Sequence, residues 1–185
     1  MSVNALGMAY YATELLPIFT KQGTPADLIF TSSIGGAVPG YSFQSPYTAS
    51  KHAAMAIAES CRDYADKNAP FIHVTCFCPE YINTTIWRGP DRRPERFQDN
   101  DNPFYQSDDY LDYIDNFRKR LEGGFNPRFV GPRLLQALDE GQIFVFPHMH
   151  THATVLARME KIKKCMERDK ELDEKYKALE GYDEI

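Results

Sequence analysis

Short apolar runs alternate with longer amphipathic segments along most of the chain. Three runs are mainly apolar, which is typical of strands buried on both faces of a sheet; they cover residues 28–31, 71–77 and 142–146. Apolar positions at helical spacing predict helices at residues 3–19, 45–67, 108–121, 130–138 and 153–179. Strands and helices that alternate in this way favour an α/β fold with a parallel sheet, although three strands are few for such a sheet.

Some of the predicted helices also indicate how they pack. Residues 53–58 are Ala, Met and Ile only, and this face of mostly small side chains allows close packing against a neighbour. Pro17 is expected to loosen the last turn of the first helix. Residues 153–179 carry one apolar stripe among many charges, so we expect a solvated extension packed by that stripe, with a partner-binding helix as the alternative. The stripe consists of Val155, Met159, Ile162, Met166, Leu172, Tyr176 and Leu179.

Length, charge and cysteine content narrow the possible functions. The 185 residues suit one domain of ordinary size. The net charge of −5 argues against nonspecific nucleic-acid binding, which needs a basic face. No apolar stretch approaches the ~20 residues that span a bilayer, and no signal peptide is recognised. We therefore expect a cytoplasmic protein without nucleic-acid or membrane partners.

The four cysteines, Cys61, Cys76, Cys78 and Cys165, form neither a C-x-x-C pair nor a zinc-binding spacing. Cys76 and Cys78 would point to the same face of a strand, where a disulfide between them is not an obvious expectation. We interpret all four as free and mostly buried thiols in a reducing compartment.

The strongest local pattern is the pair Tyr47 and Lys51, four residues apart. On a helix the two residues share a face, so the phenol and the ammonium can point into one cleft. A neighbouring ammonium favours the phenolate form of a phenol, which suits proton transfer to or from an alcohol oxygen. By itself the pattern is common and also fits an exposed helix pair. Ser32 and Ser33 follow the strand at 28–31, at the end where parallel sheets bind ligands.

These motifs stand in a definite order. Val3-Asn4-Ala5-Leu6-Gly7 comes first, thirteen residues separate Ser33 from Tyr47, and the strand at 71–77 runs into Pro79-Glu80-Tyr81-Ile82-Asn83-Thr84. The ordered set resembles the short-chain dehydrogenase/reductase family over about residues 3–150. The resemblance implies a Rossmann-like, doubly wound parallel sheet with flanking helices. It also implies hydride transfer between NAD(P) and an alcohol or ketone.

The resemblance gives a role to each matching residue. Tyr47 matches the catalytic tyrosine, and Lys51 matches the lysine that makes it more acidic and binds the nicotinamide ribose. Ser33 matches the serine that orients the substrate oxygen, with Ser32 as the alternative. Asn4 matches the asparagine that holds a water in the proton relay. The cofactor-binding residues implied are Asn4, Tyr47, Lys51, Pro79, Ile82 and Thr84, and no metal is expected.

The sequence departs from the family pattern in two places. Glu80 stands where the family has glycine, and its carboxylate either alters cofactor binding or points away. The family's T-G-x-x-x-G-x-G turn and N-N-A-G segment have no match, so the resemblance implies the last three strands of a seven-stranded fold. The residues that bind adenosine and pyrophosphate, and that select the cofactor, would then be absent. We expect poor dinucleotide binding by the chain alone, with NADP slightly favoured over NAD.

Residues 1–152 are expected to form this partial domain, and residues 153–185 a charged helical extension. Residues 88–128 occupy the place of the family's substrate-covering segment, where aromatic side chains either line an apolar pocket or shield the sheet edge. Alternating His148, His150 and His152 could share one face as metal ligands, but an exposed strand end is the expectation. The aromatic residues in and beside the segment are Trp87, Phe97, Phe104, Tyr105, Tyr110 and Tyr113.

The leading hypothesis is an NAD(P)-dependent oxidoreductase acting on a small alcohol or ketone, incomplete as this chain stands. In many members of the family the helices that correspond to those of Asn4 and Tyr47 form the dimer interface, so a homo-oligomer is expected. Two alternatives remain. The chain is a non-catalytic relic that dimerises with longer relatives, or it is a module whose cleft binds a small apolar ligand.

Overall fold

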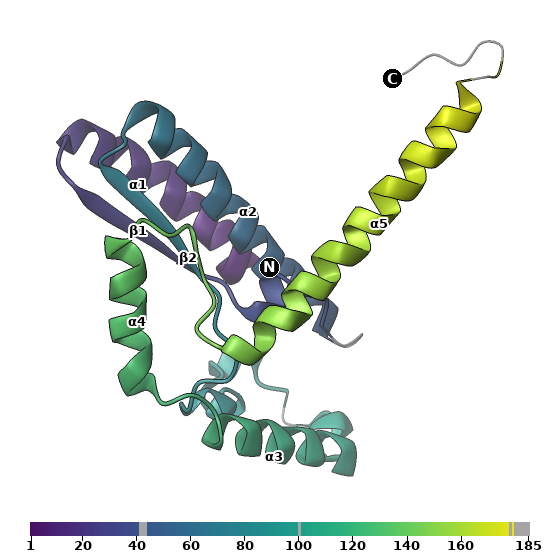
Figure 1. Ribbon diagram of the computed structural model, residues 1–185. Helices are drawn as coiled ribbons and strands as arrows, with labels where there is room; N and C mark the ends of the chain where they lie inside the picture. Colours follow the sequence, from purple (N-terminus) through teal and green to yellow (C-terminus); the bar gives the residue numbers. More distant parts are fainter. Residues whose placement is uncertain (41–43, 100, 178, 180–185) are drawn as a thin grey trace.

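Three parallel strands form the centre of the protein. The computed structural model describes residues 1–185 with the exception of 41–43, 100, 178 and 180–185. The strands are β1 (Ala26–Thr31), β2 (Ile72–Phe77) and β3 (Phe144–Val145), and they lie side by side in that order (Figure 1). β1 and β2 pair in parallel along their whole length, and β3 continues the sheet beside the end of β2. The predicted α/β fold with a parallel sheet is confirmed.

Two helices run together along one face of the sheet (Figure 1). They are α1 (Met8–Gln22), which follows a short π-helical turn at Ser2–Gly7, and α2 (Ser45–Asn68). α2 contacts both α1 and β2. Its inward residues Ala54, Ala58 and Ala65 have no exposed surface. Because alanine has no side-chain atoms beyond Cβ, this face of α2 can lie close to the strands. The strand side of this core consists of Leu28, Phe30, Ile72, Val74 and Cys76.

Three further helices follow β2 along the chain. They are α3 (Asp108–Glu122), α4 (Pro127–Asp139) and α5 (His152–Tyr176). The side chains of Ser107 and Asn126 accept hydrogen bonds from the first-turn backbone and so cap α3 and α4. α3 and α5 extend away from the sheet (Figure 1). Short 3-10 turns lie at Ile34–Gly36, Ile86–Arg88, Pro90–Arg92, Glu95–Phe97, Pro103–Gln106 and Met149–Thr151.

Several predicted elements differ from the structure. Pro17 does not loosen the end of α1, because the helix continues to Gln22 and closes at Gly23, whose φ of 69° is left-handed. β3 has two residues rather than the five predicted at 142–146. Pro147, which lacks a backbone N–H, lies two residues beyond its end.

The apolar stripe of α5 does not pack as predicted. Val155 is buried, but Met159, Ile162 and Met166 are each about half exposed or more, because α5 projects from the body of the protein (Figure 1). Within the described residues, no helix has the length and apolar character needed to cross a bilayer.

The cysteines are free, as expected, and three of them are buried. Burial raises the pKa of the Cys61 thiol. The Sγ atoms of Cys76 and Cys78 are 3.9 Å apart, and the hydrogen bond to Cys76, together with burial, raises the pKa of the Cys78 thiol. Cys165 on α5 is the exposed one.

We predict one rapidly reacting thiol per chain in a titration with a chromogenic disulfide reagent, because three of the four are shielded. Unfolding in guanidinium should release the other three, and Cys165→Ser should remove the rapid phase alone. A second rapid thiol in the folded chain would contradict the closed packing of α2 on the sheet.

Candidate functional site

The loops after β1 and β2 stay paired beyond the ends of the strands. The backbone N–H of Ser32 donates to the carbonyl of Phe77 at 2.8 Å, and that of Ile34 donates to Pro79 at 2.8 Å. The N-terminal part of α2 approaches the same place, because the hydroxyl of Ser32 donates to the carbonyl of Lys51 at 2.7 Å. The carboxyl ends of parallel strands, where α/β sheets bind ligands, therefore lie beside the helix of Tyr47 and Lys51.

The two serines after β1 have different surroundings. Ser32 is almost fully buried and its hydroxyl fastens the loop to α2. Ser33 caps the turn at Ile34–Gly36 by accepting from Gly35 N at 3.2 Å, and it donates to the carbonyl of Pro79 at 3.3 Å. Oγ of Ser33 lies beside Gly35, which Tyr47 also approaches, whereas Oγ of Ser32 lies beside Gly36.

The tyrosine and the serine flank one glycine. A methyl group built on Gly35 would lie 3.4 Å from Cε1 of Tyr47 and 3.7 Å from Oγ of Ser33. Tyr47 is 46% exposed, and within the described residues its hydroxyl has no hydrogen-bond partner. The site therefore presents a solvent-accessible phenol beside a serine hydroxyl.

Lys51 lies on the same face of α2 as Tyr47. Its Nζ donates to the carbonyl of Thr31 at 3.0 Å and lies 5.8 Å from the centre of the Tyr47 ring. Burial lowers the pKa of the Lys51 ammonium, while the nearby Cys76 and Cys78 act in the opposite direction. The ammonium and the phenol ring therefore lie on one side of α2, beside the end of β1.

Asn4 reaches the site only through the backbone of α2. Its Nδ2 donates to the hydroxyl of Ser50 at 3.3 Å, and that hydroxyl donates to the carbonyl of Tyr47 at 2.7 Å. Asn4 thus lies near the first turns of α2, and within the described residues its side chain forms no hydrogen bond to the side chain of Tyr47 or Lys51.

Gly36 is a residue whose importance the sequence did not reveal. A methyl group there would overlap the hydroxyl of Ser32 and lie 2.6 Å from the carbonyl of Lys51. The available signal was a Gly-Gly pair directly after Ser-Ser, which can mark a close approach of two backbones.

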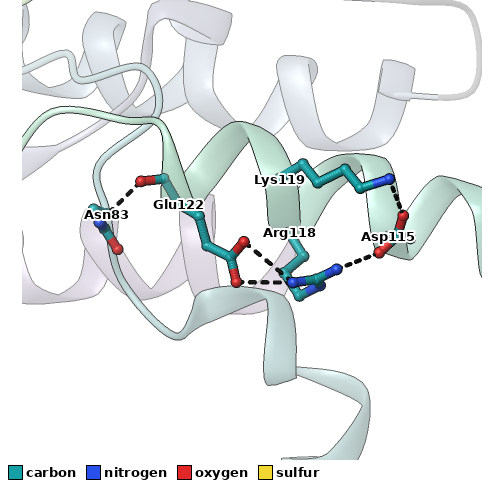
Figure 2. A network of polar contacts seen from close by, with 5 residues as sticks. All are labelled: Asn83, Asp115, Arg118, Lys119 and Glu122. Atoms are coloured by element: carbon teal, nitrogen blue, oxygen red, sulfur yellow. Dashed lines mark hydrogen bonds and ion pairs between the residues drawn. The ribbon is translucent and has the colours of Figure 1, made fainter.

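The turn after β2 contains three of the residues that the sequence predicts to contact the cofactor. Pro79 and Ile82 are partly buried and Thr84 is exposed, and Ile82 forms a parallel bridge with Phe125. Figure 2 shows how α3 holds the turn: Nδ2 of Asn83 donates to the carbonyl of Glu122 at 3.0 Å. Arg118 in turn binds the Glu122 carboxylate and Asp115, and Lys119 and Arg118 together lower the pKa of Asp115.

The expected exposed strand end is wrong for His148, which is buried. His148 and His150 contact the turn after β2. Ring nitrogens of His148 lie 3.2 Å from Glu80 N and 3.0 Å from the Tyr81 carbonyl. The carboxylate of Glu80 contacts Nε2 of His150, so the residue that stands in place of the family's glycine adds a side-chain contact to this turn. His152 contacts the carbonyl of Phe146 at 3.1 Å. Among the described residues, no cluster of three His, Cys, Asp or Glu side chains is arranged to hold a metal.

In the described part of the segment at 88–128, three of the aromatic side chains pack on one another beside a cavity. Phe104, Tyr105 and Tyr110 pack on one another with ring centres 5.1–5.5 Å apart, although Phe104 stays more than half exposed. A cavity of about 370 Å³ lies next to them, and most of its lining is polar. The lining residues are Pro90, Asp91, Arg93, Gln98, Asp99, Tyr105 and Tyr110.

Comparisons with known proteins agree on one family. The family model described as short chain dehydrogenase matches residues 1–94. A CLA biosynthesis dehydrogenase/reductase of Lactiplantibacillus plantarum is 24% identical over 162 residues, which cover 88% of this chain and 56% of that protein. A dehydrogenase/reductase SDR family protein 7-like of Drosophila melanogaster is 39% identical over 89 residues, or 46% of this chain and 25% of that one.

Solved structures show the same fold. A short-chain dehydrogenase/reductase from Burkholderia phymatum in complex with NAD superposes with a TM-score of 0.77 at 24% identity, covering 87% of this chain and 56% of that one. A short-chain dehydrogenase from Sphingobium yanoikuyae in complex with NADPH gives 0.57 at 17% identity, covering 89% and 54%. The chain thus spans about half the length of these relatives and structures, or less.

We predict that Gly36→Ala destabilises the fold by about 1–3 kcal/mol, because the added methyl group must push the loop away from α2. Gly131→Ala is the matched control, since a methyl group there meets nothing within 4 Å and should stabilise α4 by up to ~1 kcal/mol. Urea unfolding measures both. Equal stability of the Gly36→Ala and wild-type proteins would contradict the close approach described above.

Proposed function

Because the chain belongs to the short-chain dehydrogenase family, we propose that it carries the substrate- and nicotinamide-facing part of an oxidoreductase site. The proposed reaction exchanges a hydride between NAD(P) and an alcohol or ketone, with Tyr47 as the proton donor or acceptor. Since the chain spans about half the length of its relatives, the activity is proposed for the protein that contains these residues.

The observation that carries the proposal is the grouping of a phenol, a hydroxyl and an ammonium at one place. Tyr47 and Ser33 flank Gly35, and Lys51 lies one helical turn along the same face of α2. Reduction of a ketone needs a proton for the oxygen that becomes an alcohol. In this proposal the exposed Tyr47 hydroxyl gives that proton, and the Lys51 ammonium lies beside the phenol ring.

Ser33 and Asn4 have supporting roles in this proposal. The Ser33 hydroxyl bonds Pro79 at 3.3 Å, a long distance for a hydroxyl donor, so the hydroxyl can turn to a substrate oxygen at little cost. Asn4 supports the first turns of α2 through Ser50, and its family role as a water-holding residue of the proton relay belongs to the proposal.

The donors on α2 fit a nicotinamide nucleotide. An ammonium has three donors, and one on Lys51 is used by Thr31, which leaves others for ribose hydroxyls. Pro79, Ile82 and Thr84 line the turn on the other side. The nucleotide, when bound, supplies or accepts the hydride. Either NAD or NADP is proposed, because structural neighbours were solved with NAD and with NADPH.

We predict that Tyr47→Phe lowers the rate of nucleotide-dependent ketone reduction by about 100-fold or more, because the phenol proton is lost. Binding of NADPH or NADH, followed by fluorescence, should change little. The measurement is nucleotide oxidation with a panel of ketones of increasing size.

Tyr64→Phe is the matched control, since it removes a phenol hydroxyl from the same helix at a similarly exposed position. Ketone reduction that survives Tyr47→Phe would contradict the proposal. So would a folded protein that reduces no ketone with either nucleotide, and that result would favour a non-catalytic binding module.

We also propose that the protein self-associates through α1 and α2. The support is an outward face of α1 and its preceding turn, where the apolar side chains are each more than half exposed: Val3, Leu6, Tyr10, Tyr11 and Ile18. Contiguous exposed apolar side chains of this kind are typical of interfaces.

We predict that Tyr10→Glu shifts the protein to the monomer in size-exclusion chromatography with light scattering, because burying a carboxylate at an apolar interface is costly. Met166→Glu is the matched control on α5 and should leave the oligomeric state unchanged. A dimer that persists in Tyr10→Glu and dissociates in Met166→Glu would place the interface on α5 instead.

A further inference from the structure

Both ring nitrogens of His148 have hydrogen-bond partners in the turn after β2. Its Nδ1 lies 3.2 Å from the backbone nitrogen of Glu80, and its Nε2 lies 3.0 Å from the carbonyl of Tyr81. A backbone N–H can only donate, so Nδ1 is the acceptor and carries no proton. A carbonyl can only accept, so Nε2 carries the ring proton. The partners therefore specify a neutral imidazole in one tautomer.

The surroundings of His148 hold the ring rigidly. The residue is 5% exposed, and its ring lies edge-on against Phe125 with centres 5.3 Å apart. Its own carbonyl accepts from both the backbone and the hydroxyl of Thr151, where α5 begins. The imidazole is thus fixed by packing on one side and by the start of a helix on the other.

The peptide group between Pro79 and Glu80 connects this ring to the proposed site. Its N–H donates to His148, and its carbonyl accepts from Ser33 Oγ at 3.3 Å and from Ile34 N at 2.8 Å. Because a peptide group is planar, a rotation of this unit changes the bonds to Ser33 and to His148 together. The orientation of one peptide plane is therefore set from both ends.

Glu80 has a second contact that differs in kind. Its carboxylate contacts Nε2 of His150, whose side chain is 73% exposed, and a polar contact at so exposed a position contributes little to stability. The inner contact through His148 and the outer contact through His150 involve the same residue. They can be removed separately, which provides a matched control.

We propose that His148 is a positioning residue that fixes the orientation of the Pro79–Glu80 peptide and, through it, the Ser33 hydroxyl and the nicotinamide-side turn at 79–84. The expected effect of His148 on kinetics rests on the proposed function. Its effect on the orientation of the peptide group does not. Glu80 in place of glycine is compatible with this role because its carboxylate turns outward to His150.

The first test needs no activity. Long-range 15N–1H spectra of the folded chain should show His148 neutral at neutral pH, with the proton on Nε2. In His148→Phe, the amide signals of Glu80 and Ile34 and the side-chain signals of Ser33 should shift, whereas His150→Gln should leave Ile34 and Ser33 unchanged. A ring protonated on Nδ1, or Ser33 signals that do not respond to His148→Phe, would overturn the proposal.

The second test uses kinetics of the active protein. We predict that His148→Phe lowers kcat by roughly 10- to 100-fold, because the reacting groups lose their alignment, and raises KM for the nucleotide. In a Ser33→Ala background the same substitution should cost much less, since one acts through the other. Full additivity of the two effects would overturn the proposal.

His148→Asn provides a variant that retains an acceptor for the Glu80 N–H and loses the donor to Tyr81. It should restore part of the kcat lost in His148→Phe and part of the amide pattern, whether or not the phenylalanine variant folds well. No recovery over His148→Phe would contradict the role of the Nδ1 bond. Failure of the proposed function is separately visible: a protein that reduces no ketone, or that keeps ketone reduction in Tyr47→Phe, can still show the spectra expected for His148.

Discussion

The close approach of α2 to the carboxyl ends of β1 and β2 determines where every residue of the candidate site lies. Alanines on the inward face of α2 and Gly36 in the loop allow the two backbones to come near one another. The Ser32 hydroxyl then joins the loop to Lys51. Tyr47 and Lys51 are on the first turns of a helix that has little freedom to shift, which suits groups that must act at a fixed distance.

In these loops one residue holds the backbone in place and its neighbour keeps a side chain that is able to bind a ligand. Ser32 is buried and fastens the loop, while Ser33 keeps a long hydrogen bond that can be exchanged. The same division holds after β2, where the Asn83 side chain is bonded to the end of α3 (Figure 2), and Thr84 stays exposed. A firmly bonded residue next to a side chain that can change its hydrogen-bond partner keeps the site in position and still allows a ligand to bind.

The sequence predicted the sheet, the main helices and the family because these rest on local patterns. Apolar runs gave the strands, and the Tyr47–Lys51 spacing gave the shared helix face. The Met159–Met166 stripe was misjudged because periodicity shows which face is apolar and not whether anything covers it. His148 was missed because its partners are far away in the chain, although the carboxyl-end rule for parallel strands could have placed it beside residue 80.

The contact between His148 and Glu80 also bears on how the protein folds. It joins positions 68 residues apart, whereas the helices form from contacts within a few residues. Closing so long a segment lowers the conformational entropy of the chain, and only the packing that forms afterwards offsets this cost. We therefore expect the turn at 79–84 to acquire its final shape after α1, α2 and most of the sheet, and partial unfolding from the β3 end to remove that shape first. A protein that still shows its full helical signal can, for this reason, already have lost the geometry around Ser33.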